Sequence, residues 1–201
     1  MKIDKDNLLN SILESLNSLD YIKPEDIPNI SLYMDQVTTF MDTQLERSKR
    51  YDDDKILTKT MINNYTKNHL LPPSDKKKYS KEHILLLIFI YYMKNILSIR
   101  DIDILIEPLT NQYFSAEDGL TLEDIYNEVF HLEKENLNQL KQDICQKYET
   151  ASRTFLQADE DGREYLQLFS FICELCFDVY LKKQMIERMI DTLPEPNHKK
   201  K

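Results

Sequence analysis

The apolar run from Ile84 to Met93 limits the folds open to this chain more than any other feature. None of its ten residues is charged, so a helix built from them is apolar on every side and is expected at the centre of a small domain. Ser80 can cap this helix, with Glu82 in its first turn. The run is too short to cross a bilayer, and no basic segment followed by an apolar core opens the chain. The sequence therefore predicts a soluble, cytoplasmic protein with no membrane contact.

Apolar residues recur at helical spacing along nearly the whole chain, and alternating strand-like runs are almost absent. This pattern predicts an all-α fold. Helices are expected at about residues 8–19, 31–46, 58–68, 80–93, 98–107, 121–156 and 165–190. The charged segment "RSKRYDDDK" should be a mobile loop. Pro108 is expected to end a helix and leave a linker at 109–120, and Gly162 is expected to break the pattern before the last helix.

The two glycines, Gly119 and Gly162, exclude the common glycine-rich phosphate sites. Neither the P-loop nor the dinucleotide-binding fingerprint can be assembled from them. No serine, histidine and carboxylate lie in a pattern that suggests a catalytic triad. We therefore expect a protein that is not an enzyme and that carries no cofactor.

Potential metal ligands occur without the partners that a metal site needs. Cys173 and Cys176 have the spacing of zinc and redox sites, but there is no second pair, so they are expected to be buried and unpaired. Glu128 and His131 form one half of a di-iron pattern, whose second half is missing from the helices. No metal is expected.

Charge is distributed unevenly along this chain, whose formal net charge is -9. Residues 55–83 hold seven lysines and two acidic residues, whereas residues 101–164 hold 16 acidic residues and five basic ones. An anionic partner is therefore expected at the first region alone. Chance clustering of surface charge is the plainer alternative.

Helical spacing sorts the side chains of residues 59–68 onto two faces. Met61, Ile62 and Tyr65 gather on one side, and polar residues point to the other. Asparagine can pair bidentately with adenine, and lysine can contact guanine or phosphate. The polar side thus has the composition of a recognition helix. Its candidate DNA-binding residues are Lys59, Thr60, Asn63, Asn64 and Lys67.

The segment after this helix turns through Pro72 and Pro73 and returns with a basic run. A short basic excursion beside a recognition helix can touch an adjacent phosphate backbone. Its candidate DNA-binding residues are Lys76, Lys77, Lys78 and Tyr79. Singly, exposed asparagines and a lysine run are most often solvated surface, but their occurrence together favours nucleic acid.

The order of these parts resembles the MerR family of winged helix-turn-helix regulators. The resemblance rests on "YTKNHLLPP", "YSKEHILLLIFI" and "LSIRDIDIL", and it extends loosely over residues 31–108. It implies a winged helix that binds duplex DNA, although this wing holds lysines where that family usually has arginines. The "MDQVTTFMD" and "LTKTMINNYTKN" stretches are also similar to a bacterial family classed as a domain of unknown function.

With this resemblance the chain divides into an N-terminal helix and lead-in (1–28), a MerR-like winged-helix module (29–108), a C-terminal helical module (119–192) and a frayed tail (193–201). The predicted function is a sequence-specific DNA-binding transcriptional regulator. The alternative is a protein-interaction module that kept the winged-helix fold without DNA binding. A continuous basic face of lysines would favour the first, and residues 52–54, three aspartates folded over that face, would favour the second.

The C-terminal module is expected to join two chains. The MerR resemblance implies a homodimer paired through the long helix after the winged helix. A near-heptad seam in this helix suits such pairing, and its candidate interface residues are Leu137, Leu140, Ile144, Tyr148 and Phe155. Residues 169–180, "FSFICELCFDVY", either line a pocket for a small-molecule or protein effector or fill the C-terminal core. Their apolar density on more than one side favours the core.

Overall fold

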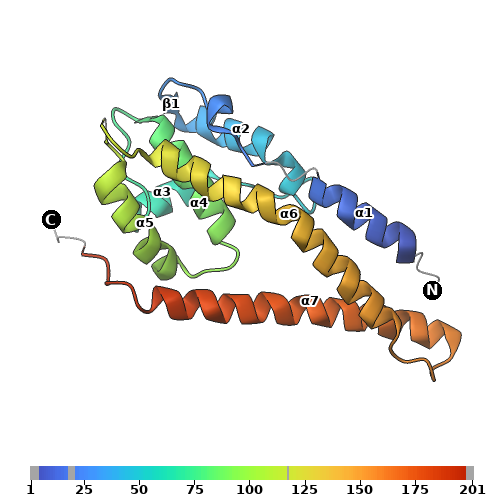
Figure 1. The fold of residues 1–201 in the computed structure, drawn as a ribbon. Helices are drawn as coiled ribbons and strands as arrows, with labels where there is room; N and C mark the ends of the chain where they lie inside the picture. The colour runs from blue at the N-terminus through green and yellow to red at the C-terminus, as the bar shows by residue number, and fades with distance from the viewer. Residues whose placement is uncertain (1–4, 18–20, 117, 198–201) are drawn as a thin grey trace. The chain divides into compact units, whose positions relative to one another are not determined.

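The computed structural model describes residues 5–17, 21–116 and 118–197. In these residues the chain is mostly helical, as expected, with one small two-stranded sheet (Figure 1). The elements are α1 (Lys5–Asn17), η1 (Pro24–Asp26), β1 (Leu32–Tyr33), α2 (Met34–Gln44), η2 (Glu46–Ser48), α3 (Lys59–Lys67), β2 (Lys78–Tyr79), α4 (Lys81–Met93), α5 (Ile99–Tyr113), α6 (Leu122–Ser152) and α7 (Glu160–Ile190). No helix in the described ranges has the length and apolar character needed to cross a membrane.

The chain folds as two compact units. Unit 1 combines α1 with residues 131–185, and unit 2 holds residues 21–130 and the segment from Ile186 onward. These boundaries differ from the four segments drawn on the sequence, because the long helices α6 and α7 each contribute residues to both units. Unit 2 contains all the candidate DNA-binding residues between Lys59 and Tyr79, so it is the unit that positions the candidate site.

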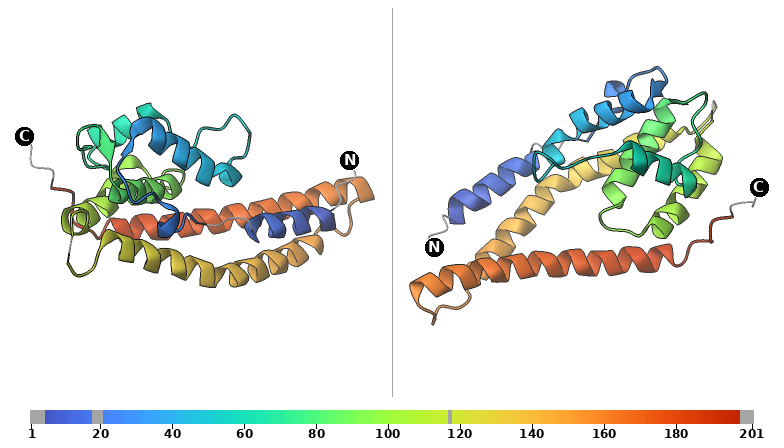
Figure 2. Two further views of the ribbon diagram at one scale, coloured as in Figure 1. Left: turned by 90° about the horizontal axis from the view of Figure 1, so that it is seen from above. Right: turned by 180° about the vertical axis from the view of Figure 1, so that it is seen from behind.

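The core of unit 2 is built around α4. Every residue from His83 to Tyr91 is buried, as the apolar run predicts. The buried faces of α2, α3 and α5 belong to the same hydrophobic cluster, and these helices gather around α4 (Figures 1 and 2). The start of α6 closes the core, where the hydroxyl of Tyr126 donates to the carbonyl of Ile22 at 2.5 Å. Each fully buried leucine or isoleucine of α4 stabilises this unit by about 1.5–3 kcal/mol.

Strands β1 and β2 pair antiparallel, with Leu32 opposite Tyr79 and Tyr33 opposite Lys78. The expectation that a helix starts at about Ser31 is wrong here, because the backbone of β1 pairs with β2 instead. Side chains alternate across a strand, so Leu32 and Tyr79 are buried while Tyr33 and Lys78 are exposed. Helix α2 begins only after this pairing.

Three predicted helix starts are confirmed by side-chain caps. Thr58 accepts a hydrogen bond from the backbone N–H three residues on, at the start of α3. Ser98 and Asp101 form a reciprocal capping box at α5, and Thr121 and Asp124 form another at α6. Each cap satisfies backbone donors that the first turn leaves without a helical partner, a contribution of about 1 kcal/mol.

Helix α5 continues through Pro108 to Tyr113, so the expectation that Pro108 ends the helix is wrong. The linker expected at 109–120 is correspondingly shorter. Pro108 lacks the N–H that would bond to the carbonyl of Ile104. The fully buried side chain of Ile106 holds this part of α5 on the core of unit 2. Packing therefore outweighs one missing hydrogen bond.

In unit 1, helices α1, α6 and α7 share one small apolar cluster. Ile144 and Ala151 of α6 and Phe171 of α7 are buried there, and leucines of α1 pack against them. Lys147 of α6 forms an ion pair with Asp178 of α7 at 2.7 Å and another within α6. The ion pair and the cluster fix one side of α7.

The start of α7 differs from the sequence-based prediction. Asp159 accepts a hydrogen bond from the backbone N–H of Gly162 at 2.7 Å and caps the helix. Gly162 therefore lies in the first turn of α7 and does not break the pattern. The break lies at residues 153–159, where Phe155 has a positive φ of 52°.

The expectation that the last helix is largely buried is wrong. Tyr165, Phe169 and Phe177 of α7 are 62%, 52% and 66% exposed. The described part of unit 1 supplies one short cluster to cover this helix, so apolar side chains on its other sides stay in contact with solvent. For the same reason Cys176 is exposed, not buried as expected.

Candidate nucleic-acid interface

Helix α3 exposes the residues that the sequence assigned to DNA. Ile62 and Tyr65 are buried and Met61 is partly buried against the core, so one side of the helix is fixed. Burial also raises the pKa of the Tyr65 hydroxyl. The opposite side is exposed along its whole length, and carries Lys59, Thr60, Asn63, Asn64 and Lys67. The two faces expected from helical spacing are therefore present.

The chain leaves α3 through a left-handed residue before it reaches the prolines. His69 has a φ of 64°, and the N–H of Leu70 donates back to the carbonyl of Tyr65 at 3.0 Å. Leu70 and Leu71 are then fully buried. Burial of these two leucines anchors the loop to the core and so fixes where residues 72–78 leave it.

Lysines occupy the tight turn between Asp75 and Lys78. The N–H of Lys78 donates to the carbonyl of Asp75 at 2.8 Å, and both central residues have positive φ, 48° at Lys76 and 67° at Lys77. This is the geometry of a type I′ turn, which asparagine and glycine usually occupy. Both lysines are exposed at the tip.

The strand after the turn corrects one candidate residue. Tyr79 is only 4% exposed, and its ring packs edge-on against that of His83 with 5.4 Å between centroids. It cannot reach a ligand outside the protein, because strand alternation turns it into the core. The exposed aromatic side chain here is Tyr33 of β1, over whose ring the Nζ of Lys78 lies at 5.3 Å. The sequence pattern did not identify Tyr33, because its exposure beside Lys78 depends on the pairing of β1 with β2.

His83 of α4 packs against the end of β2. Its Nδ1 accepts a hydrogen bond from the N–H of Ser80 at 3.0 Å, and its ring lies edge-on to Phe114 at 4.7 Å. Its Nε2 is buried without a hydrogen-bond partner in the described structure. Burial is the largest effect on the pKa of His83 and lowers it. The ring is therefore neutral near pH 7.

Two exposed acidic residues lie on this surface, Asp35 beside α3 and Asp75 at the start of the lysine turn. Asp35, in the first turn of α2, forms an ion pair with Lys59, and Asp35 lies two residues after Tyr33, the partner of Lys78. The start of α3 and strand β2 therefore lie on either side of the β1–α2 junction. Asp54 accepts hydrogen bonds from the backbone of its own loop. In the described ranges, no ion pair joins residues 52–54 to the lysines of α3 or the turn.

The expected dimer seam of α6 is divided between the core and the surface. Ile144 is buried, and Tyr148 packs against Phe171 of α7, with 5.5 Å between ring centroids. Leu140 is exposed, Leu137 is half-buried, and Phe155 lies beyond the end of α6. Part of the seam is therefore occupied within one chain.

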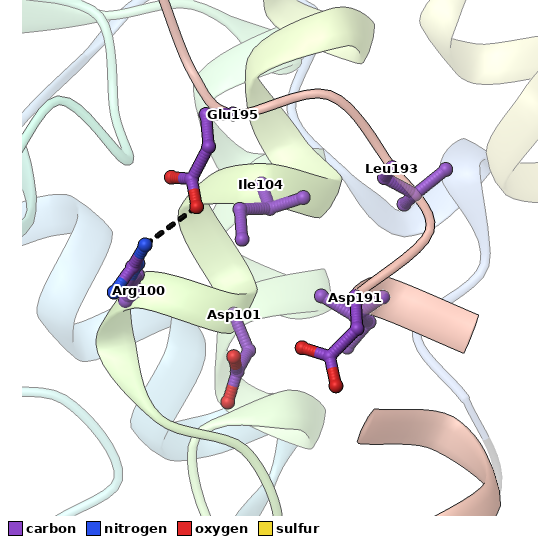
Figure 3. Close-up of a pocket in the computed structure, with 7 residues that line it drawn as sticks. Arg100, Asp101, Ile104, Asp191, Leu193 and Glu195 are labelled. Carbon is purple, nitrogen blue, oxygen red and sulfur yellow. Dashed lines mark hydrogen bonds and ion pairs between the residues drawn. The ribbon is translucent and has the colours of Figure 1, made fainter. Parts of the chain in front are cut away.

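A shallow pocket of about 190 Å³ lies in unit 2 where the chain after α7 passes α5 (Figure 3). Its lining residues are Arg100, Asp101, Ile104, Ile190, Asp191, Leu193 and Glu195. The guanidinium of Arg100 already pairs with Glu195 at 2.5 Å, and Asp101 accepts the capping hydrogen bonds of Ser98. The lining is acidic on balance, so the pocket does not suit an anionic ligand.

The described residues contain no group of three histidine, cysteine, aspartate or glutamate side chains placed to hold a metal ion. The three cysteines are free thiols.

The chain was compared with known families, curated proteins and solved structures. Curated proteins and solved structures give no significant match. The family described as "Domain of unknown function (DUF1836)" matches residues 22–129, a range that follows the continuous part of unit 2 at residues 21–130. Because this match covers more than half of the chain, the protein belongs to the DUF1836 family.

Proposed function

We propose that unit 2 is a MerR-like winged helix-turn-helix module and that the protein is a sequence-specific transcriptional regulator. In this proposal α3 enters the major groove of duplex DNA, and the turn at Lys76 and Lys77 lies on the neighbouring phosphate backbone. The order α2, α3, β2, α4 and α5 supports this assignment, because it matches the order of parts in the family that the sequence resembles.

The lysine turn is the observation that carries the proposal. A residue with a Cβ in the left-handed region is disfavoured by on the order of 1 kcal/mol or more, and Lys76 and Lys77 are both in that region. Asn-Gly would form the same turn with less backbone strain. Strained lysines at an exposed tip therefore suggest a function. Two positive charges held on a rigid turn suit phosphate oxygens.

Specificity in this proposal comes from α3. Asn63 and Asn64 are exposed on a helix whose other side is fixed by Ile62 and Tyr65. A side chain on a rigid helix can present its amide to one base edge, and asparagine suits adenine. We propose that Asn63 contacts a base and that the lysines of the turn contact phosphates.

Selection of bound sequences from random duplex DNA tests the proposal. The wild type should enrich a motif. On that motif, Asn63→Ala should weaken binding by roughly 1–3 kcal/mol and leave non-specific binding nearly unchanged. Replacing Lys76, Lys77 and Lys78 together with alanine should weaken binding to every sequence, and lower the slope of log K against log salt by about 0.9 for each phosphate that is no longer neutralised.

Two variants in unit 2 serve as matched controls. Asn127→Ala removes an exposed asparagine from the surface of α6, and Lys23→Ala removes an exposed lysine next to η1. Neither lies on α3 or in the turn, so neither should change affinity or specificity. Failure of the wild type to enrich any motif, with no binding even at low salt, would reject DNA binding.

The ion pair between Asp35 and Lys59 favours a second candidate function. It neutralises one lysine of α3 and adds an acidic group that a phosphate backbone would repel. A protein-interaction module with the same fold would tolerate such a pair. Asp35→Asn separates the two functions, because DNA affinity should rise if Lys59 is released for a phosphate and should stay at zero if the surface binds no DNA.

A further inference from the structure

Exposed apolar side chains form a stripe along α7 in unit 1. Tyr165, Phe169, Ile172, Cys176 and Val179 follow one another at alternating spacings of four and three residues, and all five are exposed. We call these five residues the α7 stripe. The alternation is the heptad pattern of helices that pair along a seam. In the described part of unit 1, no helix covers this seam.

The opposite side of α7 is already in use. Gln167 and Phe171 are buried, and Gln167 donates to the carbonyls of Ser152 and Thr154 at 2.7 and 3.0 Å. The ion pair from Lys147 of α6 adds to this contact. Helix α7 is therefore fixed in unit 1 by one side and presents the α7 stripe on another.

We infer that the α7 stripe pairs with the same stripe of a second copy of the chain, in antiparallel orientation. This interaction surface goes beyond the proposed function and does not depend on DNA binding. It also differs from the α6 seam, in which Ile144 is buried within a single chain. The α7 stripe, by contrast, can meet a second copy without any change in the core of unit 1.

The exposed area is sufficient for a dimer. Tyr165, Phe169, Ile172 and Val179 are 62%, 52%, 49% and 61% exposed, and Tyr180 beside them is 59% exposed. With about 200 Å² for a large aromatic side chain, the five side chains leave on the order of 450 Å² uncovered on each copy. Complete burial of these side chains on two copies would remove about 900 Å² from solvent, which is close to the roughly 1,000 Å² expected of a biological interface.

Charge selects the antiparallel orientation. Between Glu160 and Asp178 the sequence of α7 has five acidic residues and one basic residue, and between Val179 and Ile190 it has three basic residues and one acidic residue. Antiparallel pairing places the acidic half of each helix beside the basic half of the other, whereas parallel pairing places like charges together. Opposite charges beside such a seam set the orientation of paired helices.

The spacing also fixes the register. When the pair is centred between Ile172 and Cys176, Ile172 of one copy lies against Cys176 of the other, and Phe169 lies against Val179. In heptad notation Phe169 and Cys176 occupy a positions, and Ile172 and Val179 occupy d positions. Each of these layers therefore joins an a position of one helix to a d position of the other, as antiparallel pairing requires. The two Cys176 thiols then lie in different layers.

Light scattering on the purified full chain tests the dimer at micromolar concentration. The wild type should have twice the chain mass of 24.0 kDa. Phe169→Glu should give the mass of one chain, because it introduces a charge into the seam while the side chain is exposed in the single chain. The matched control is Leu140→Glu, at an exposed position of the α6 seam, which should leave the dimer intact. Circular dichroism would check that both variants are folded.

Cysteine cross-linking tests the orientation. With Cys145 and Cys173 changed to serine, mild oxidation should give little covalent dimer through Cys176 alone. Adding Ile172→Cys should give abundant covalent dimer, because positions 172 and 176 share a layer in the antiparallel register. Efficient cross-linking through Cys176 alone would show parallel pairing. A wild type of single-chain mass, or dissociation by Leu140→Glu but not by Phe169→Glu, would overturn the inference.

Discussion

Replacing Lys76 and Lys77 with Asn-Gly should stabilise the protein and weaken its binding to DNA. Both lysines have positive φ, 48° and 67°, in a turn closed by the N–H of Lys78 and the carbonyl of Asp75 at 2.8 Å. Asn-Gly is the preferred pair for this turn type. Relief of two left-handed residues, at about 1 kcal/mol for each, should raise the free energy of unfolding by about 1–2 kcal/mol.

These magnitudes are measurable. For a chain of this size 1 kcal/mol corresponds to roughly 2–4 °C in the unfolding midpoint, so thermal unfolding followed by circular dichroism should shift upward by about 2–8 °C. If two phosphates are no longer neutralised, the salt slope of DNA binding should fall by about 1.8, from about 0.9 for each phosphate. Stability and binding should therefore change in opposite directions.

The double variant Lys76→Ala and Lys77→Ala is the matched control. It removes the same two charges and keeps a Cβ at both left-handed positions, so it should lose DNA affinity equally without gaining stability. A lower unfolding midpoint for the Asn-Gly variant would refute the role of strain in this turn. Unchanged DNA affinity in both variants would refute phosphate binding by these lysines.

Two further predictions concern the core of unit 2. Burial lowers the pKa of His83, so the unfolded chain binds a proton at higher pH than the folded chain. The contribution of neutral His83 to the free energy of unfolding should be fully present above the unfolded pKa of about 6.5. It should be lost as the pH falls from there to the lower folded pKa. Urea unfolding across this pH range should show a smaller decrease in the free energy of unfolding for His83→Gln than for the wild type. Pro108→Ala should restore the hydrogen bond to the carbonyl of Ile104 and raise the free energy of unfolding by about 1–3 kcal/mol. A fall in the unfolding midpoint of Pro108→Ala would show instead that the proline conformation is needed for packing of α5.

Local sequence patterns determined the helices and the two faces of α3. Caps at Thr58, Ser98 and Thr121 involve residues only three apart, so they can be identified without knowledge of the rest of the fold. The apolar run at Ile84 likewise predicted a buried helix, because a segment that is apolar on every side has no exposed side to offer. Helical spacing was enough to separate Asn63 from the buried face.

Predictions that depended on distant partners were less successful. Leu32 and Tyr33 have helical spacing with α2, yet pairing with β2 makes them a strand and exposes Tyr33 while burying Tyr79. Pro108 is tolerated inside α5 because burial of Ile106 outweighs one missing hydrogen bond. The pattern of residues along the sequence does not show how strongly strand pairing or side-chain burial will compete with local helix preference.

The last helix shows most clearly what the sequence by itself determined and what the tertiary structure decided. Apolar spacing from Tyr165 onward predicted that α7 is a helix, but it favoured a buried helix over an exposed one. The order of the charged residues in the sequence gives this helix an acidic half and a basic half. Whether the apolar side chains are buried depends on how many other segments reach them. Burial is a property of the neighbours brought together by the whole chain, and in unit 1 those neighbours cover one side of α7 and leave the α7 stripe exposed.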